Sequence, residues 1–249
     1  PLVIASFMVI SVAGFRLSKG VNGPQTFYYA SGQVMSEGEY VDGEMNGQWK
    51  YFHEGGKQQV LASYENGRED GEWEWYYEND QLMRKGSYKN GLFEGVWLNY
   101  YENGILSDSS YYTQGRIDGE SATFYENGQL ISKGSYKRDR QEGLWINFYE
   151  NGHKNSEGNF EAGELKGLWK YWNQDGSPLQ EFEFDAAGEY KIINAWDRNG
   201  QQIVKDGSGE YRSYLDDGTL VWRGRVEKGV KTGNWDTFHV NGKRIEEGV

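Results

Sequence analysis

The sequence predicts an all-β protein: an elongated, single-layer antiparallel β-meander built from tandem hairpin repeats of about 24 residues. Three observations support this fold class. Turn glycines recur at a constant interval, aromatic residues recur in the same register, and strand-length runs show no helical periodicity. Because one such hairpin cannot bury its apolar face alone, each repeat should be stabilised mainly by its neighbours.

Turn glycines mark the repeat along almost the whole chain. The regular markers are Gly32, Gly56, Gly104, Gly128, Gly152, Gly176 and Gly200. Adjacent markers are 24 residues apart, and Asp80 takes the place of glycine once. The interval shortens to 18 residues at Gly218 and returns to 24 at Gly242. The short interval predicts either a bend in the array or a boundary between two blocks of repeats.

Each repeat is predicted to be a hairpin of two short strands. Asn-Gly pairs separate aromatic runs of five to eight residues, as at Asn103-Gly104. Both residues of a type I′ turn need positive φ, which Asn and Gly tolerate. The predicted turns therefore lie at residues 55–56, 79–80, 103–104, 127–128 and 151–152. A second glycine-rich connection, as at residues 90–95, should lead to the next hairpin.

Counting outward from a two-residue turn gives the strand register. The count places Trp73 opposite Gly86 and Trp145 opposite Gly158. It also places three tyrosines, Tyr64, Tyr88 and Tyr136, opposite Gly47, Gly71 and Gly119. Large rings therefore face residues without a side chain, and we expect the rings to cover the glycine backbone.

The first twenty residues differ from the repeats. Residues 1–15 carry no charge, and Ser11-Val12-Ala13 resembles the cleavage site of a secretory signal. A membrane anchor and a buried first strand are the alternatives. A signal or anchor predicts an exported protein, in the periplasm, in the envelope or outside the cell; otherwise a cytoplasmic location is expected. The predicted organisation is an apolar segment at 1–20, a regular array at 21–200 and C-terminal repeats at 201–249.

Several of these columns resemble the MORN repeat family in its bacterial variant. The matching residues are Tyr100-Tyr101-Glu102-Asn103-Gly104, Gly134-Ser135-Tyr136 and Gly143-Leu144-Trp145. The resemblance covers about residues 21–249 and implies an array of β-hairpins. Some bacterial proteins of this type are classed as YwqK-like antitoxins, which neutralise a partner toxin, and eukaryotic relatives are associated with membrane tethering and scaffolding. The resemblance thus implies a binding or scaffolding role.

The sequence offers little for catalysis or for a cofactor. It has no cysteine, and its three histidines, His53, His153 and His239, are predicted to be surface residues too far apart to share a site. The glutamates that precede the turns form one column and are interpreted as a solvated ridge rather than a catalytic carboxylate pair. We therefore predict that the protein is not an enzyme and binds no cofactor or metal.

Charge indicates the class of partner. The net charge of −12 predicts repulsion from nucleic acids and anionic lipids, so membrane contact is expected only through the N-terminal segment, if that segment is an anchor. Residues 37–80 contain twelve acidic residues and only three basic ones, which gives this segment a net charge of −9. The basic residues are Lys50, Lys57 and Arg68. This block favours either solubility or docking of a basic protein. The alternative function is an exported carbohydrate- or envelope-binding module that uses the aromatic rows.

The candidate partner-binding residues come from this acidic block and from the turn columns. They are Glu69, Asp70, Glu72, Glu74, Glu54, Glu78, Glu102, Tyr77, Tyr101 and Tyr125.

Overall fold

The computed structural model describes residues 20–215 and 218–245, which form 21 β-strands and no helix. Every strand pair with a defined register within its two units is antiparallel, which confirms the predicted all-β class of tandem hairpins. In the described ranges, no helix is long and apolar enough to cross a membrane. The apolar segment predicted to be a signal or anchor lies outside the described residues.

The chain divides into two compact units. Unit 1 ends at Trp97 and unit 2 begins at Leu98, so the division falls within β8 (Leu92–Tyr100). The other strands of unit 1 are β1 (Gly23–Tyr28), β2 (Val34–Val41), β3 (Glu44–Phe52), β4 (Gln58–Glu65), β5 (Arg68–Glu69), β6 (Gly71–Tyr76) and β7 (Leu82–Lys89).

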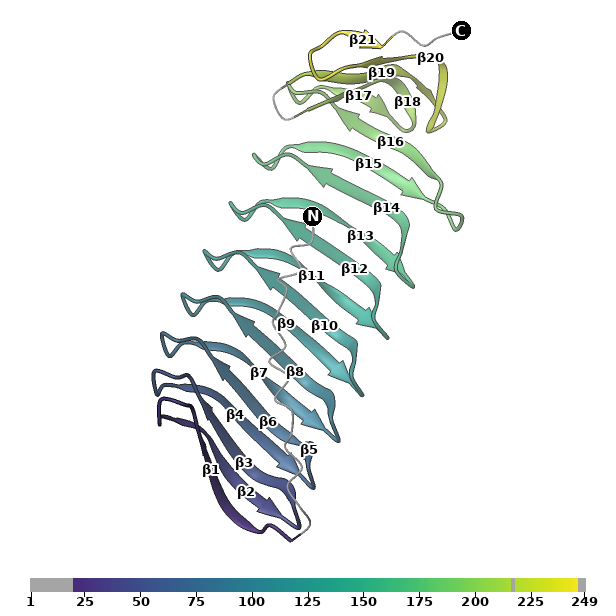
Figure 1. Cartoon of the computed structure of the whole chain (residues 1–249). Coiled ribbons are helices and arrows are strands. Elements are labelled where there is room, and N and C mark those ends of the chain that lie inside the picture. The colour runs from purple at the N-terminus through teal and green to yellow at the C-terminus, as the bar shows by residue number, and fades with distance from the viewer. Residues whose placement is uncertain (1–19, 216–217, 246–249) are drawn as a thin grey trace. The chain divides into compact units, whose positions relative to one another are not determined.

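Unit 2 begins with regular hairpins, and its later strands are less even in length, from two residues to nine (Figure 1). The regular strands are β9 (Leu106–Thr113), β10 (Arg116–Phe124), β11 (Leu130–Lys137), β12 (Arg140–Phe148), β13 (Lys154–Glu161) and β14 (Glu164–Trp172). They are followed by β15 (Pro178–Phe184), β16 (Tyr190–Trp196), β17 (Gln202–Lys205), β18 (Ser208–Tyr214), β19 (Leu220–Glu227), β20 (Val230–Phe238) and β21 (Arg244–Ile245).

The turns at the glycine markers are three-residue loops. Gly104 N donates to Tyr101 O at 2.9 Å, Tyr101 N donates to Ile105 O at 2.8 Å, and Gly104 has a φ of 81°. This is the geometry of a type I turn followed by a left-handed glycine. The predicted type I′ geometry is therefore wrong here, because Asn103 keeps a negative φ. Its side-chain oxygen instead accepts a hydrogen bond from Ile105 N at 2.9 Å.

Type I′ turns occur at the second glycine-rich connection. Asn90 and Gly91 both have positive φ, 51° and 80°, as this turn requires. The same pair of positive φ values recurs at 42–43, 66–67, 114–115 and 162–163. In the regular repeats, one edge of the sheet therefore carries three-residue loops, here called the loop edge. The other edge carries two-residue turns and is called the turn edge.

The predicted strand register is confirmed. Trp73 pairs with Gly86 and Trp145 with Gly158, and Tyr64, Tyr88 and Tyr136 pair with Gly47, Gly71 and Gly119. A β-bulge follows each three-residue loop, as beside Phe148. The bulge adds one residue to the second strand of the hairpin. This addition restores the register that a two-residue turn would have produced.

The shortened interval lies where the end of unit 2 bends back on itself. Ile192 N donates to Gly229 O at 2.8 Å, Gly229 N to Gly207 O at 2.9 Å, and Gly207 N to Ile193 O at 2.8 Å. These bonds join β16 to the turns at 206–207 and 228–229. They enclose a core of Ile192, Ala195, Val204, Tyr211 and Val226. We call this arrangement the C-terminal curl.

Candidate partner-binding surface

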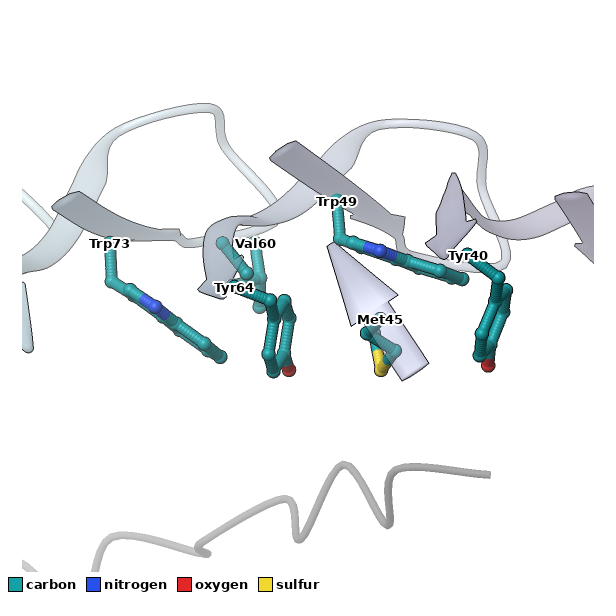
Figure 2. Packing of buried hydrophobic residues seen from close by; sticks show 7 residues of the cluster. Tyr40, Met45, Trp49, Val60, Tyr64 and Trp73 are labelled. Carbon is teal, nitrogen blue, oxygen red and sulfur yellow. The ribbon is translucent and has the colours of Figure 1, made fainter. Parts of the chain in front are cut away.

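One side of the sheet in unit 1, here called the Trp face, carries Trp49, Trp73 and Trp97. These side chains are 1%, 5% and 0% exposed, respectively. Figure 2 shows Trp49 and Trp73 on the same side of the strands as Tyr40 and Tyr64. The Trp face is therefore the packed side of unit 1, and we call the other side the back face.

Each tryptophan of this column packs over a small residue of the preceding strand. A Cβ added to Gly86 would lie 2.2 Å from the Trp97 ring, and Trp97 Nε1 donates to Ser87 O at 3.2 Å. The backbone partner of Gly86, however, is Trp73. Rings do cover glycines as predicted, but the covering ring comes from the neighbour on the other side of the glycine.

A wide β-bulge explains why each glycine is covered by the tryptophan of the following strand and not by its backbone partner. The register passes from Glu37–Lys50 to Glu39–Asn46, so Gly38 faces the three residues 47–49. The Trp49 ring folds back over Gly38, where an added Cβ would lie 2.1 Å from the ring. The same packing recurs in unit 2 between Gly134 and Trp145, Gly158 and Trp169, and Gly224 and Trp235. The glycine column is thus required by the indole rings.

Two tyrosine hydroxyl groups meet on the Trp face of unit 1. The hydroxyl oxygens of Tyr51 and Tyr64 are 3.4 Å apart. Burial raises the pKa of Tyr64 and raises the pKa of Tyr51 to about 12. Both hydroxyls therefore stay protonated at neutral pH and can donate hydrogen bonds.

Glu69 is the one predicted site residue of the acidic block that lies on this face. It pairs with Tyr64 across the turn edge and is half-buried. Burial is the main cause of the raised pKa of Tyr51, Tyr64 and Tyr88, and the negative charge of Glu69 raises these pKa values further. The structure therefore places a carboxylate among three neutral tyrosines.

Asp70 lies at the turn edge and holds the next turn. Its carboxylate accepts hydrogen bonds from Asn90 N and Lys89 Nζ, both at 3.0 Å. The Asn90 amide, followed by Lys89, lowers the pKa of Asp70. Asn46 acts similarly one repeat earlier, where its side-chain oxygen accepts from Asn66 N at 3.4 Å. Asp70 therefore has a structural role.

Glu72 and Glu74 lie on the back face. Glu72 is exposed, whereas Glu74 is half-buried and 3.7 Å from Lys85 Nζ. The Tyr76 hydroxyl also donates to the Glu74 carboxylate. Of these two glutamates, Glu72 has the side chain that is available to a partner.

The glutamates of the turn column are exposed on the loop edge. Glu54 and Glu78 lie there in unit 1, and Glu102 lies in the corresponding loop of unit 2. The ten candidate residues therefore do not form one site. They are distributed over the Trp face, the back face and both edges.

The tyrosines beside these glutamates join each loop to the next. Tyr101 Oη donates to Phe124 O at 2.6 Å, and Asn103 Nδ2 donates to Glu126 O at 3.2 Å. Tyr77, in the same column, is half-buried. The Tyr-Glu-Asn-Gly motif is thereby explained: tyrosine and asparagine link the loops, glycine takes the left-handed conformation, and glutamate points to solvent. We call these loop-to-loop hydrogen bonds the loop ladder. The sequence analysis did not predict them, although the fixed spacing of the motif was a signal for them.

Replacing Tyr125 with Phe tests the ladder. Tyr125 Oη donates to Phe148 O at 3.1 Å, and the substitution removes only this hydroxyl. We expect the free energy of unfolding to fall by about 1 kcal/mol in urea denaturation. Tyr111→Phe is the matched control, since Tyr111 is 42% exposed. Equal effects of the two substitutions would contradict the ladder.

Two histidines also contribute to these links. His53 Nε2 lies 3.3 Å from Tyr76 O, and His153 Nδ1 lies 2.8 Å from Gln174 O. Within residues 20–215 and 218–245, no three His, Asp or Glu side chains are grouped so that they could hold a metal ion.

Five segments match the family model described as the MORN repeat variant, at residues 21–42, 69–90, 93–114, 117–138 and 141–162. These five segments are therefore similar to the MORN repeat variant. Each matched segment ends in a turn-edge residue and contains one three-residue loop. Residues 45–66 lie between two matches and form the same hairpin, although Ala62 replaces the packed glycine there. MORN repeats support a role in interaction with proteins or membranes.

The other comparisons add nothing on function. No curated protein matches the chain. The crystal structures of TcdB2-TccC3-Cdc42 and TcdB2-TccC3 are similar at 9% identity, with TM-scores of 0.22 and 0.18. Each alignment covers 89% of this chain, which spans only 13% and 16% of those two chains. These likenesses carry no argument about this protein.

Proposed function

We propose that this protein is a non-catalytic interaction module that docks a basic partner protein through unit 1. The observation that carries the proposal is the concentration of charge: residues 37–80 hold −9 of the total −12 and lie entirely in unit 1. Such a field accelerates the approach of a positively charged partner. Antitoxin-like neutralisation of a partner is one specific form of this binding.

Exposed glutamates present this charge on more than one side of unit 1. Glu39 and Glu72 are exposed on the back face, and Glu54 and Glu78 on the loop edge. Sugar binding by stacked rings is less favoured, because the rings of the tryptophan column lie against glycine backbone and are almost fully buried. The acidic surface therefore supports a protein partner better than a glycan.

The test compares two variants of equal charge. In the first, Glu39, Glu54, Glu72 and Glu78 of unit 1 are replaced by Gln. The set leaves out Asp70 and Glu74, whose carboxylates make structural contacts. The control replaces four exposed glutamates of unit 2, Glu120, Glu126, Glu150 and Glu164, by Gln. Both variants change the net charge by the same amount.

The measurement is the association rate of a 20-residue lysine- and arginine-rich peptide over a range of salt concentrations. The unit 1 variant should associate about tenfold more slowly at low salt and show a weaker salt dependence. The unit 2 variant should stay close to the unchanged protein. Equal slowing by both variants would mean that only net charge matters. Binding to anionic phosphatidylglycerol vesicles instead of the peptide would also overturn the proposal.

A further inference from the structure

Glu69 occupies a position that is apolar in most other repeats. The residue at this position follows the two-residue turn and pairs with an aromatic side chain on the Trp face, as Met45 pairs with Tyr40. Met45 is 6% exposed and belongs to the core of unit 1. The equivalent residues of the other regular repeats are Phe93, Ile117, Gln141 and Leu165, and those of the C-terminal curl are Gly209 and Lys231. Packing alone does not explain a glutamate here, because an apolar side chain fills the same place one repeat earlier.

The surroundings of the Glu69 carboxylate are mainly aromatic. One cation lies near them: besides the larger effect of burial, the positive charge of Arg84 lowers the pKa of Tyr88, whereas the negative charge of Glu69 raises it. A Cβ added to Gly91 would lie 3.5 Å from Glu69 Oε2, so the carboxylate lies over the neighbouring turn. Its charge acts on the hydroxyls of Tyr51, Tyr64 and Tyr88. Within residues 20–215 and 218–245, no ion pair or hydrogen bond engages the Glu69 side chain. A carboxylate that makes no ion pair attracts a cation.

The Trp face already accommodates one guanidinium group against its rings. Arg84 Cζ lies 4.3 Å from the centroid of the Trp97 ring, 5.0 Å from that of Phe93 and 5.6 Å from that of Trp75. A guanidinium is planar and weakly hydrated, so it stacks on aromatic rings more readily than an ammonium group does. Arg84 shows that a guanidinium group can lie against the rings of this face.

We propose that Glu69, together with Tyr51, Tyr64 and Tyr88, forms a binding site for one arginine side chain of the basic partner. This inference rests on the proposed function and gives it a point of specificity. The carboxylate pairs with the guanidinium through charge-assisted hydrogen bonds, and the tyrosine rings line the site. The exposed glutamates of unit 1 attract any basic partner, whereas this site distinguishes arginine from lysine.

The test uses blocked tetra-arginine and tetra-lysine peptides, whose charges are equal, with tetra-citrulline as the neutral analogue. Affinities are measured by the quenching of tryptophan fluorescence and by calorimetry. The unchanged protein should bind tetra-arginine about tenfold more tightly than tetra-lysine, because a guanidinium can make two parallel hydrogen bonds to a carboxylate, and it should not bind tetra-citrulline. Glu69→Gln should abolish the preference for arginine.

Two further variants separate this site from folding and from general charge. Glu69→Met inserts the residue found one repeat earlier, so it should keep or raise the melting temperature and still lose the arginine preference. The unit 1 variant with four Gln should bind both peptides more weakly but keep the preference. If the unit 1 variant binds both peptides as tightly as the unchanged protein does, the proposed function is contradicted but the arginine site is not. Equal affinities of the unchanged protein for both charged peptides, or a preference that survives Glu69→Gln, would overturn the arginine site.

Discussion

Replacement of Trp97 by Ala is expected to lower the free energy of unfolding by about 3–5 kcal/mol. Trp97 is fully buried, covers the backbone of Gly86 and donates its indole hydrogen bond to Ser87 O. The substitution removes the ring, leaves a cavity in a single-layer sheet and leaves Gly86 uncovered. Because the described strands form one sheet, none of them can move in from a second sheet to fill the space, and we expect little compensation.

Val96 provides the matched control for this substitution. It is adjacent in sequence, points to the back face and is 52% exposed. Val96→Ala should change the free energy of unfolding by less than about 0.5 kcal/mol. Thermal and urea denaturation of both variants measure the difference. A Trp97→Ala protein as stable as Val96→Ala would show that the tryptophan column does not hold the repeats together.

Replacement of Gly207 by Ala is expected to open the C-terminal curl, at a cost of about 3 kcal/mol or more. Gly207 has a φ of 74°, which an L side chain rarely adopts. An added Cβ would also lie 2.6 Å from the backbone nitrogen of Gly229. Backbone atoms cannot move aside as a side chain can, so the two turns must separate.

Gly233→Ala is the control, because Gly233 has a similar φ of 64° and no atom within 4 Å of an added Cβ. It should cost only the backbone strain, about 1 kcal/mol. Hydrogen exchange locates the effect: in Gly207→Ala the amides of Ile192 and Gly229 should exchange faster, whereas those of β10–β13 should not. Uniform acceleration along unit 2, or none, would contradict a local curl.

The register could be predicted from the sequence, but the turn types could not. Trp145 pairs with Gly158, as counting outward from residues 151–152 predicts, because the bulge compensates for the extra loop residue. The Asn-Gly pair, however, occurs in both kinds of turn: Asn103-Gly104 ends a three-residue loop, and Asn90-Gly91 forms a type I′ turn. An Asn-Gly pair therefore predicts a glycine in the left-handed region but does not predict the length of the loop.

The candidate site was predicted only as a region of charge. The count over residues 37–80 identified unit 1, but charge alone could not separate Asp70, which holds a turn, from Glu69, which lies among tyrosines. A comparison of columns would have separated them, since Glu69 replaces an apolar residue, whereas Asp70 is equivalent to Asn46. Which ring covers which glycine was also missed, because the wide bulge cannot be read from strand alternation.

The spacing of the loop-edge hydrogen bonds has a consequence for how such a chain changes length. Tyr101 and Tyr125 each reach a carbonyl 23 residues further along, and Asn103 and Asn127 do the same. An internal duplication or deletion of one complete 24-residue copy recreates every one of these bonds at the new junction, whereas any other length breaks them. Copy number in the regular part can therefore vary between descendants of one ancestral gene. The C-terminal curl depends on an 18-residue interval, so a 24-residue insertion or deletion within it would not recreate its hydrogen bonds.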